Sequence, residues 1–272
     1  MPSQRNDLKL DNVNGSKNTR MDFSRLNDNM DYRKDEVMHI GRYTNAAGTM
    51  VDLSKKLKRP IRVLDIGCGE MNSARLLYKA VQGKKSEILK EYVGVDIDYI
   101  MANKAKEKYG NAYRVCNARF VIQDLTVNSS IPFSDGYFDF VICFEFLEHV
   151  QPRFAPPILK EVARVLNVNG LALFSTPNSN GSNEKLPHDH IYEYSYEELL
   201  QMFQNAGFLV EDATGVCVNI SKIPAEEKNA YRHILERYYR AFGDNTAFAS
   251  VAVAPLFDPR NCKNVVYRLI KE

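Results

Sequence analysis

The stretch Val63-Leu-Asp-Ile-Gly-Cys-Gly69 decides the fold of this chain. An apolar run ends in an acidic residue, and two glycines then follow one residue apart. The pattern predicts a buried strand that opens into a loop where backbone comes close to a ligand, because glycine has no Cβ to keep the ligand away. Taken alone, such a loop also occurs in many nucleotide-binding proteins and in ordinary strand-to-helix turns.

The segments after this stretch alternate between strand and helix patterns. Apolar strands are predicted over 61–66, 91–95, 119–122, 138–143 and 171–176, and amphipathic helices over 73–81, 99–109, 155–166 and 196–206. This alternation predicts an α/β fold with a mostly parallel sheet covered by helices on both faces. Strands over 207–210 and 265–270 complete a Rossmann-like, doubly wound sheet of seven strands.

Composition favours a single globular domain with additions. The chain has 272 residues, of which 44% are hydrophobic and 26% charged, which is ordinary for a soluble protein. No apolar run approaches the roughly twenty residues of a membrane helix, and residues 1–7 lack the apolar core of a signal peptide. Five scattered cysteines indicate reduced thiols in a cytoplasmic protein. A net charge of +2 neither favours nor excludes an anionic partner, and the oligomeric state is left undefined.

Three regions differ in character along the chain. Residues 1–32 are polar and predict a flexible tail, and residues 33–272 predict one domain. Within that domain, 33–58 predicts two short helices with breaks at Gly41 and Gly48. Residues 225–260 predict an insertion or lid, in which 225–242 forms a charged, tyrosine-rich helix; an ordinary amphipathic helix is the alternative.

The order of these strands, each followed by polar residues, resembles that of the class I S-adenosylmethionine-dependent methyltransferases. The resemblance implies that the seventh strand is antiparallel and that helices over 33–58 cover the cofactor. Two departures stand out: Glu70-Met71 follows the glycines where many members have a small residue, and the gap from Asp65 to Asp96 exceeds the roughly twenty residues of a typical strand-helix-strand unit. The alternative is a nucleotide-type fold without methyl transfer.

Three aspartates fall at or near strand ends, where ligands bind in such sheets: Asp65, Asp96 and Asp124. The glycine loop and the helix after it suit the carboxylate of S-adenosylmethionine, and Asp96 suits a ribose diol. The resemblance implies that Asp124 and Leu125 contact the adenine, with Ile97 on its other face. The predicted cofactor-binding set is Asp65, Gly67, Cys68, Gly69, Asp96, Ile97, Asp124, Leu125 and Cys143. Each aspartate has an alternative role as a helix cap or turn residue, and Asp65 has one in ordering the loop.

A second cluster of acidic and histidine residues follows the fourth strand. Glu145, Glu148 and His149 have i, i+3, i+4 spacing, which places them on one face of a helical turn. Carboxylates and an imidazole on one face repel or titrate abnormally unless something positive lies between them. His190 follows the next strand, from which it can face the first three.

This cluster carries a narrower resemblance. Glu-x-x-Glu-His, then Ser-Thr-Pro-Asn and Asp-His, is similar to the small-RNA 3′-terminal 2′-O-methyltransferases and, more loosely, to the ubiquinone-biosynthesis O-methyltransferases. The resemblance implies that Glu145, Glu148, His149 and His190 hold a divalent cation. Mg²⁺, Mn²⁺, Co²⁺ or Zn²⁺ suits such oxygen and nitrogen ligands. The alternative is a site without metal, in which His149 is a general base or orients a loop.

We therefore expect an S-adenosylmethionine-dependent methyltransferase that acts on an oxygen of a hydroxylated small molecule such as a sugar, catechol or polyketide-like metabolite. An RNA ribose 2′-O-methyltransferase is the first alternative, although basic residues such as those at 55–59 are few for an RNA-binding face. Phe144-Glu-Phe-Leu147 stands where DNA amino-methyltransferases carry an Asp/Asn-Pro-Pro-aromatic motif. A catalytically inactive sensor of the cofactor would keep the same binding residues.

Overall fold

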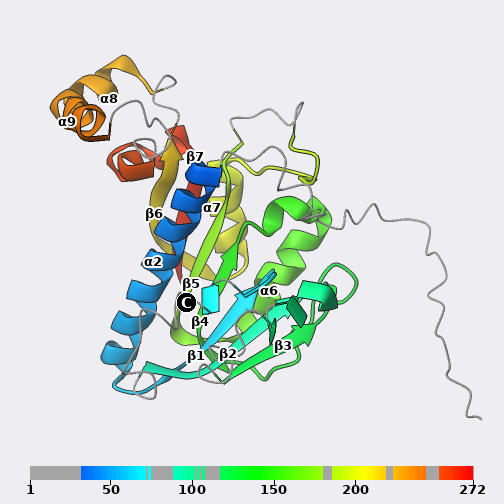
Figure 1. Cartoon of the computed structure of the whole chain (residues 1–272). Helices are drawn as coiled ribbons and strands as arrows, with labels where there is room; N and C mark the ends of the chain where they lie inside the picture. The colour runs from blue at the N-terminus through cyan, green and yellow to red at the C-terminus, as the bar shows by residue number, and fades with distance from the viewer. Residues whose placement is uncertain are drawn as a thin grey trace, which may run out of the picture.

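A computed structural model of the chain describes residues 32–71, 73–74, 88–101, 103–104, 106–107, 117–179, 186–218, 223–242 and 251–271. Its centre is a seven-stranded sheet with the order β3-β2-β1-β4-β5-β7-β6 (Figure 1). The strands are β1 (Ile61–Ile66), β2 (Leu89–Asp96), β3 (Ala118–Ile122), β4 (Phe138–Phe144), β5 (Leu166–Pro177), β6 (Phe208–Val218) and β7 (Cys262–Lys271). The longer helices are α2 (Tyr32–Leu57), α6 (Ala155–Val165), α7 (Tyr196–Asn205), α8 (Ala225–Ala230) and α9 (Arg232–Phe242).

The sheet is mixed. β1 pairs in parallel with β2 and β4, whereas β7 runs antiparallel between β5 and β6. The predicted fold class, a doubly wound Rossmann-like sheet with an antiparallel last strand, is confirmed. The strand order reverses between β1 and β4, so the carboxyl ends of these two strands border the crevice where ligands bind in such sheets.

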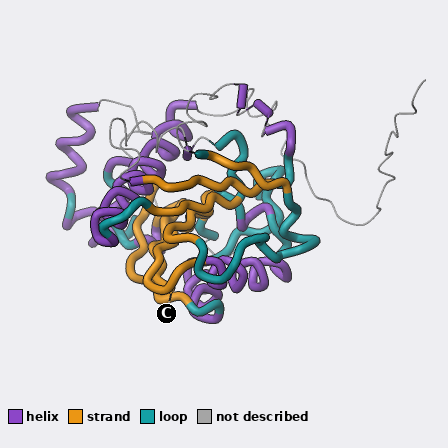
Figure 2. The backbone as a smooth tube through the Cα atoms, turned by 90° about the horizontal axis from the view of Figure 1, so that it is seen from below, coloured by secondary structure: helices purple, strands orange, loops and turns teal. Residues whose placement is uncertain are grey.

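Hydrophobic packing covers both faces of the sheet. Along β4, Val141 and Cys143 belong to one core cluster, which includes α6 and α7, while Phe140 and Ile142 belong to the other, which includes α2. This division follows from the two-residue period of a strand, and both sides of the strand are apolar because helices lie on both (Figure 2). The apolar runs over 61–66, 91–95 and 138–143 are therefore buried strands of a three-layer domain, whereas β3 at the edge of the sheet is only partly covered.

The expectation of two short helices over 33–57 is wrong, because a single helix, α2, runs from Tyr32 to Leu57. Gly41 and Gly48 lie inside it, and neither has a positive φ. A glycine within a helix costs only about 1 kcal/mol relative to alanine. Packing on the sheet outweighs that cost, since Met50 and Leu53 are buried on this helix.

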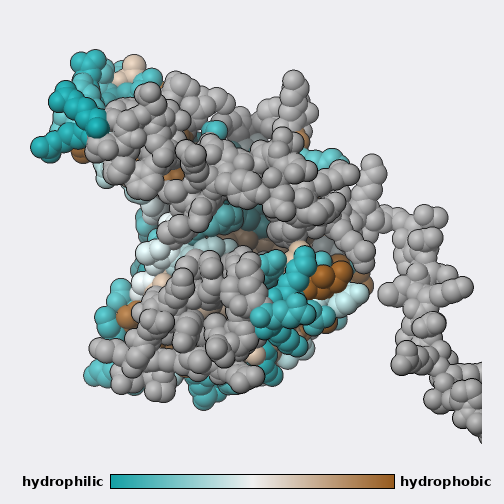
Figure 3. Space-filling model, in the orientation of Figure 1, coloured by the Kyte–Doolittle hydropathy of each residue, from teal (hydrophilic) through white to brown (hydrophobic). Residues whose placement is uncertain are grey.

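Other element bounds also differ from the expectations. The predicted helix over 225–242 is two helices, α8 and α9, separated at Tyr231, whose ring packs edge-on against Phe257. The two helices present a hydrophilic surface (Figure 3). The predicted helix over 73–81 is described only at Ser73 and Ala74, where it is helical, and the predicted tail, apart from Tyr32, lies outside the described residues. Every helix in the described ranges is too short or too polar to cross a membrane.

Candidate functional site

The glycine loop leaves β1 at the centre of the sheet. The Gly67 amide donates to the Val95 carbonyl over 2.9 Å, and both Gly67 and Gly69 have positive φ values, 65° and 48°. A Cβ at Gly67 would lie 2.6 Å from Phe146 Cδ2, whereas a Cβ at Gly69 would meet nothing within 4 Å. Gly67 therefore permits close packing behind the loop, and Gly69 leaves open space beside the backbone, as a closely bound ligand requires.

Asp96 joins the glycine loop to the end of β2. Its Oδ2 accepts a 2.8 Å hydrogen bond from the Gly69 amide, and its Oδ1 accepts one of 3.0 Å from the Asp98 amide. Burial raises the pKa of Asp96 above its ordinary value, although the two amides act in the opposite direction. Each carboxylate oxygen has a second lone pair, so the group that fixes the loop retains capacity to accept from a ligand hydroxyl.

Asp65 lies beneath the loop. It is 3% exposed and accepts a hydrogen bond from the Tyr92 hydroxyl, and burial raises its pKa to about 7. Of the two predicted cysteines, Cys68 is 7% exposed and Cys143 is 1% exposed. Burial raises the pKa of both thiols. Asp65 and Cys143 thus belong to the packing under the crevice.

The predicted adenine-binding residues lie at the ends of β2 and β3. Ile97 is 54% exposed, whereas Leu125 is 5% exposed. Asp124 Oδ1 accepts from the amide of Thr126 over 2.8 Å and from its hydroxyl over 2.6 Å. Asp124 therefore acts as a turn residue, which was the alternative to a contact with the adenine. Ile97 offers an uncovered apolar surface.

Glu148, His149 and His190 come together beyond β4 and β5. One side-chain ligand atom from each of the three lies within 4.8 Å of those of the other two, and the two imidazole rings are 5.1 Å apart, edge to face. The Glu148 carbonyl accepts from the Ile191 amide over 2.7 Å, which ties the His190 loop to the turn η1 (Leu147–His149). His190 thus meets Glu148 and His149, from which it is far in the sequence, at the place where β4 and β5 end.

Both imidazoles are oriented through Nδ1. His149 Nδ1 lies 2.8 Å from the Asp189 carbonyl oxygen, and His190 Nδ1 lies 2.7 Å from Glu193 Oε1. A carbonyl only accepts, so His149 Nδ1 carries a proton and Nε2 of its neutral ring keeps a lone pair. Burial lowers the pKa of His149, which favours that neutral form. Such outer partners are those that metal-binding histidines have in proteins.

Glu148 supplies an acidic ligand atom to the same place. It is fully buried, its Oε2 accepts from the Thr176 hydroxyl over 3.2 Å, and its Oε1 has no hydrogen-bond partner. A buried carboxylate oxygen left unpaired is costly. The Glu148 carboxylate, with this unpaired oxygen, and the two imidazoles form a donor set that fits a divalent cation.

Glu145 is adjacent to these three residues, and its charge acts on Glu148 and His149, but it is not part of the group whose ligand atoms lie within 4.8 Å of one another. Only Leu147–His149 form a helical turn, of the 3-10 type, whereas Glu145 has a left-handed backbone with φ 51°; the expected common helical face is therefore wrong. Its Oε1 forms an ion pair with Arg42 Nη1 and accepts from the Ser175 hydroxyl over 2.9 Å. Its Oε2 accepts from Asn264 Nδ2 over 3.1 Å.

The sequence analysis missed the face of α2 that borders the site. Arg42 is 2% exposed, and the ring of Tyr43 packs against Phe144, 5.9 Å away. His39 stacks on Tyr43, and burial, followed by the Arg42 charge, lowers its pKa to about 4. The spacing of His39, Arg42 and Tyr43 at i, i+3 and i+4 was the available signal, but the helical prediction for this segment rested on its apolar residues alone.

A family model described as "Methyltransferase domain" matches residues 38–213, which is more than half of the chain. A probable S-adenosylmethionine-dependent methyltransferase of Mycolicibacterium smegmatis is 30% identical over 158 residues, covering 57% of this chain and 54% of that protein. A malonyl-[acyl-carrier protein] O-methyltransferase of Legionella pneumophila is 30% identical over 120 residues, covering 43% and 36%. The chain thus spans about half or less of the length of these relatives.

Solved structures support the same fold at low identity. The [4+2]-cyclase SpnF superposes with a TM-score of 0.56 at 20% identity, covering 85% of this chain and 80% of that one. A putative sarcosine dimethylglycine methyltransferase from Galdieria sulphuraria gives 0.55 at 16% identity, covering 85% and 86%. With its glycine loop, acidic strand ends and seven-stranded sheet, the chain belongs to the methyltransferase domain family and has the class I fold of S-adenosylmethionine-dependent methyltransferases.

Proposed function

We propose that this chain transfers a methyl group from S-adenosylmethionine to an oxygen of a hydroxylated small molecule, with assistance from a divalent cation. The convergence of Glu148, His149 and His190 at the ends of β4 and β5, beside the glycine loop of β1, is the observation that supports it most. The relative from Legionella pneumophila, whose name specifies O-methylation, is consistent with transfer to oxygen.

The cofactor site in this proposal is the glycine loop and the residues around it. The open space beside Gly69 takes the methionine part, Asp96 takes the ribose diol, and the exposed Ile97 takes one face of the adenine. Asp65, Cys68, Leu125 and Cys143 shape the site from beneath. Asp124 orders the turn at the adenine end.

The residues that would hold a divalent cation are Glu148, His149 and His190, with Glu145 adjacent and paired to Arg42. Such a cation supplies Lewis acidity, which lowers the pKa of a bound hydroxyl. Asp189 and Glu193 fix the imidazoles with Nε2 available. If no cation takes part, the same His149 Nε2 is placed to accept the hydroxyl proton as a general base.

The test is transfer of a labelled methyl group to a panel of catechols, sugars with vicinal diols and short RNAs, before and after exhaustive chelation. We expect transfer to a small diol, loss of transfer on chelation, and recovery with Mg²⁺, Mn²⁺ or Co²⁺. His190→Ala should lose transfer, and His188→Ala, an exposed histidine two residues away, should keep it.

Each other outcome identifies a different function. Full transfer after chelation would show that the cation takes no part in the reaction and would leave His149 as the general base. Methylation of RNA alone supports the ribose 2′-O-methyltransferase. Binding of the cofactor without transfer to any acceptor supports a sensor.

A further inference from the structure

Two consecutive residues of β5 hydrogen-bond the two glutamates that follow β4. The Ser175 hydroxyl donates to Glu145 Oε1 over 2.9 Å, and the Thr176 hydroxyl donates to Glu148 Oε2 over 3.2 Å. Successive side chains of a strand point to opposite faces of the sheet, and the residues of β7 that pair with these two belong to different core clusters. Each glutamate is therefore bound from a different face of β5.

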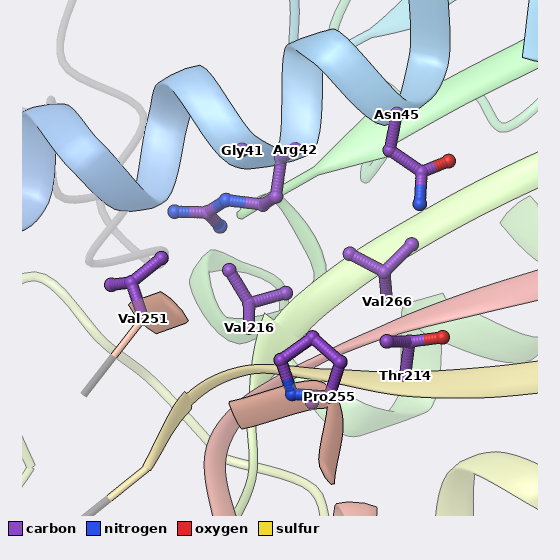
Figure 4. Close-up of a pocket in the computed structure, with 9 residues that line it drawn as sticks. Gly41, Arg42, Asn45, Thr214, Val216, Val251, Pro255 and Val266 are labelled. Carbon is purple, nitrogen blue, oxygen red and sulfur yellow. The ribbon is translucent and has the colours of Figure 1, made fainter. Parts of the chain in front are cut away.

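The Glu145 carboxylate is committed to its own partners. Both of its oxygens accept hydrogen bonds, and Arg42 forms an ion pair with Oε1. Figure 4 shows Arg42 extending beneath α2 toward Val216, in a pocket that Gly41 also lines, and none of the described residues around this pocket is acidic. Glu145 therefore compensates the Arg42 charge, which leaves Glu148 as the carboxylate of the candidate centre.

Glu148 is held by its backbone and by one of its two carboxylate oxygens. Its carbonyl accepts from the Ile191 amide over 2.7 Å and from the Tyr192 amide over 3.2 Å. The side chain is fully buried, and Oε1 has no hydrogen-bond partner among the described residues. The last torsion of a glutamate side chain is broad, so the backbone alone does not decide which oxygen points where. The Thr176 hydroxyl distinguishes the two oxygens, because it donates to Oε2.

Thr176 gives this hydroxyl a fixed position. The residue is 1% exposed, so water has little access to take the place of the donor. Its backbone pairs with Val265 of β7 inside the sheet, and a β-branched side chain is stiff at χ1. The donor is therefore as rigid as the strand that bears it.

We propose that Thr176 is a positioning residue for the candidate cation centre: its hydroxyl holds Glu148 Oε2, so that Oε1 is the oxygen presented to a divalent cation beside His149 and His190. The proposal rests on the metal-assisted transfer proposed above. A carboxylate can bind a cation through one oxygen or two. Holding Oε2 limits Glu148 to one ligand atom, which keeps coordination positions for the vicinal hydroxyls of an acceptor.

The test is titration of the metal-free chain with Co²⁺, followed by the visible absorption of the bound ion. Valine has nearly the shape of threonine without the hydroxyl, so Thr176→Val should weaken Co²⁺ binding by about 10–100-fold, the usual effect of losing a group that orients a metal ligand. The absorption bands of its Co²⁺ complex should also shift, because the carboxylate is free to bind through either oxygen or both. Thr176→Ser keeps the donor and should restore most of the affinity and the wild-type bands.

Thr214→Val is the matched control, because Thr214 lies on the neighbouring part of the sheet, in β6, and its hydroxyl donates to the exposed Asp212 over 3.0 Å. It should bind Co²⁺ as the wild type does. Thermal denaturation of each metal-free variant reports whether it folds. Thr176→Ala, which also lacks the hydroxyl, takes the place of Thr176→Val if the valine variant is unfolded.

The outcomes separate this proposal from the one on which it rests. Binding by the wild type with equal affinity in Thr176→Val would overturn the positioning role and leave the cation in place. An equal loss in Thr176→Ser, or in Thr214→Val, would also overturn it, because the hydroxyl at 176 would then not be the cause. Absence of Co²⁺ binding by the wild type itself would overturn both proposals, whereas Co²⁺ binding without methyl transfer to any acceptor would count against the transfer alone.

Discussion

Arg42 and Glu145 form an ion pair that joins the middle of α2 to the end of β4, and Ser175 and Asn264 complete the bonds of the carboxylate. The pair is largely withdrawn from water, with side chains 2% and 24% exposed. One buried cation thus holds the covering helix on the sheet and pairs with the carboxylate that lies beside Glu148, His149 and His190.

Arg42→Ala should lower the free energy of unfolding by about 3–5 kcal/mol, because removing one partner leaves the other charge uncompensated. Urea denaturation at pH 7 measures the change. Lys55→Ala is the comparison, since Lys55 pairs with Asp52 on the same helix at 3.7 Å with both side chains mostly exposed; it should have little effect. Similar losses in both variants would contradict the role given to the buried pair.

Asp96→Ala should weaken the binding of S-adenosylhomocysteine by about 1–3 kcal/mol, because the proposed charge-assisted hydrogen bonds to the ribose are lost together with the one from the Gly69 amide. Isothermal calorimetry gives the affinity directly. Asp52→Ala, which removes an exposed carboxylate from α2, should leave the affinity unchanged. An unaltered affinity in Asp96→Ala would remove this residue from the site.

Glu193→Ala should weaken Co²⁺ binding by about 10–100-fold, the usual effect of losing the partner that orients a metal-binding histidine. The Glu193 carboxylate contacts His190 Nδ1 and leaves the ring's Nε2 free. Titration followed by the visible absorption of bound Co²⁺ reports the affinity, with His188→Ala as the control. Equal affinities in wild type and Glu193→Ala would show that the carboxylate does not orient a ligand.

Asp65→Asn should remove a pH-dependent loss of stability. Burial, with the Asp96 charge acting in the same direction, raises the Asp65 pKa from 3.8 to about 7 despite hydrogen bonds from Tyr92 and Ser73. The folded chain therefore binds this proton more tightly than the unfolded chain does. The protonated Asp65 accordingly contributes to the free energy of unfolding, and this contribution is fully present below pH 3.8 and is lost as pH rises through 7. Denaturation at pH 5 and pH 8 should show a smaller loss in Asp65→Asn than in wild type, and equal losses would contradict it.

Gly48→Ala should raise the free energy of unfolding by about 0.5–1 kcal/mol, because alanine has a smaller entropic cost in a helix and its Cβ would meet nothing within 4 Å. Thermal denaturation followed by circular dichroism measures it. A destabilised variant would mean that the helix needs glycine at this position.

The pattern of the sequence predicted the parts that depend on neighbouring residues along the chain. Alternating apolar segments located the strands, whereas the antiparallel direction of β7 was implied by the family resemblance and not by the pattern. The i, i+3, i+4 rule failed for Glu145, because the backbone turns left-handed there, a local conformation that residue spacing does not reveal. The helix break at Gly41 and Gly48 failed because burial of Met50 and Leu53 outweighs a glycine's propensity.

The sequence by itself determined the class of fold, the position of the glycine loop and the acidic residues at the strand ends, since these follow from strand period, glycine geometry and the topology of parallel sheets. Only the tertiary structure decided that His190 meets His149, that Arg42 neutralises Glu145 and that Gly41 borders a pocket. Those contacts join residues of separate elements, and their distances depend on how α2 and the loops pack on the sheet, which no local pattern encodes.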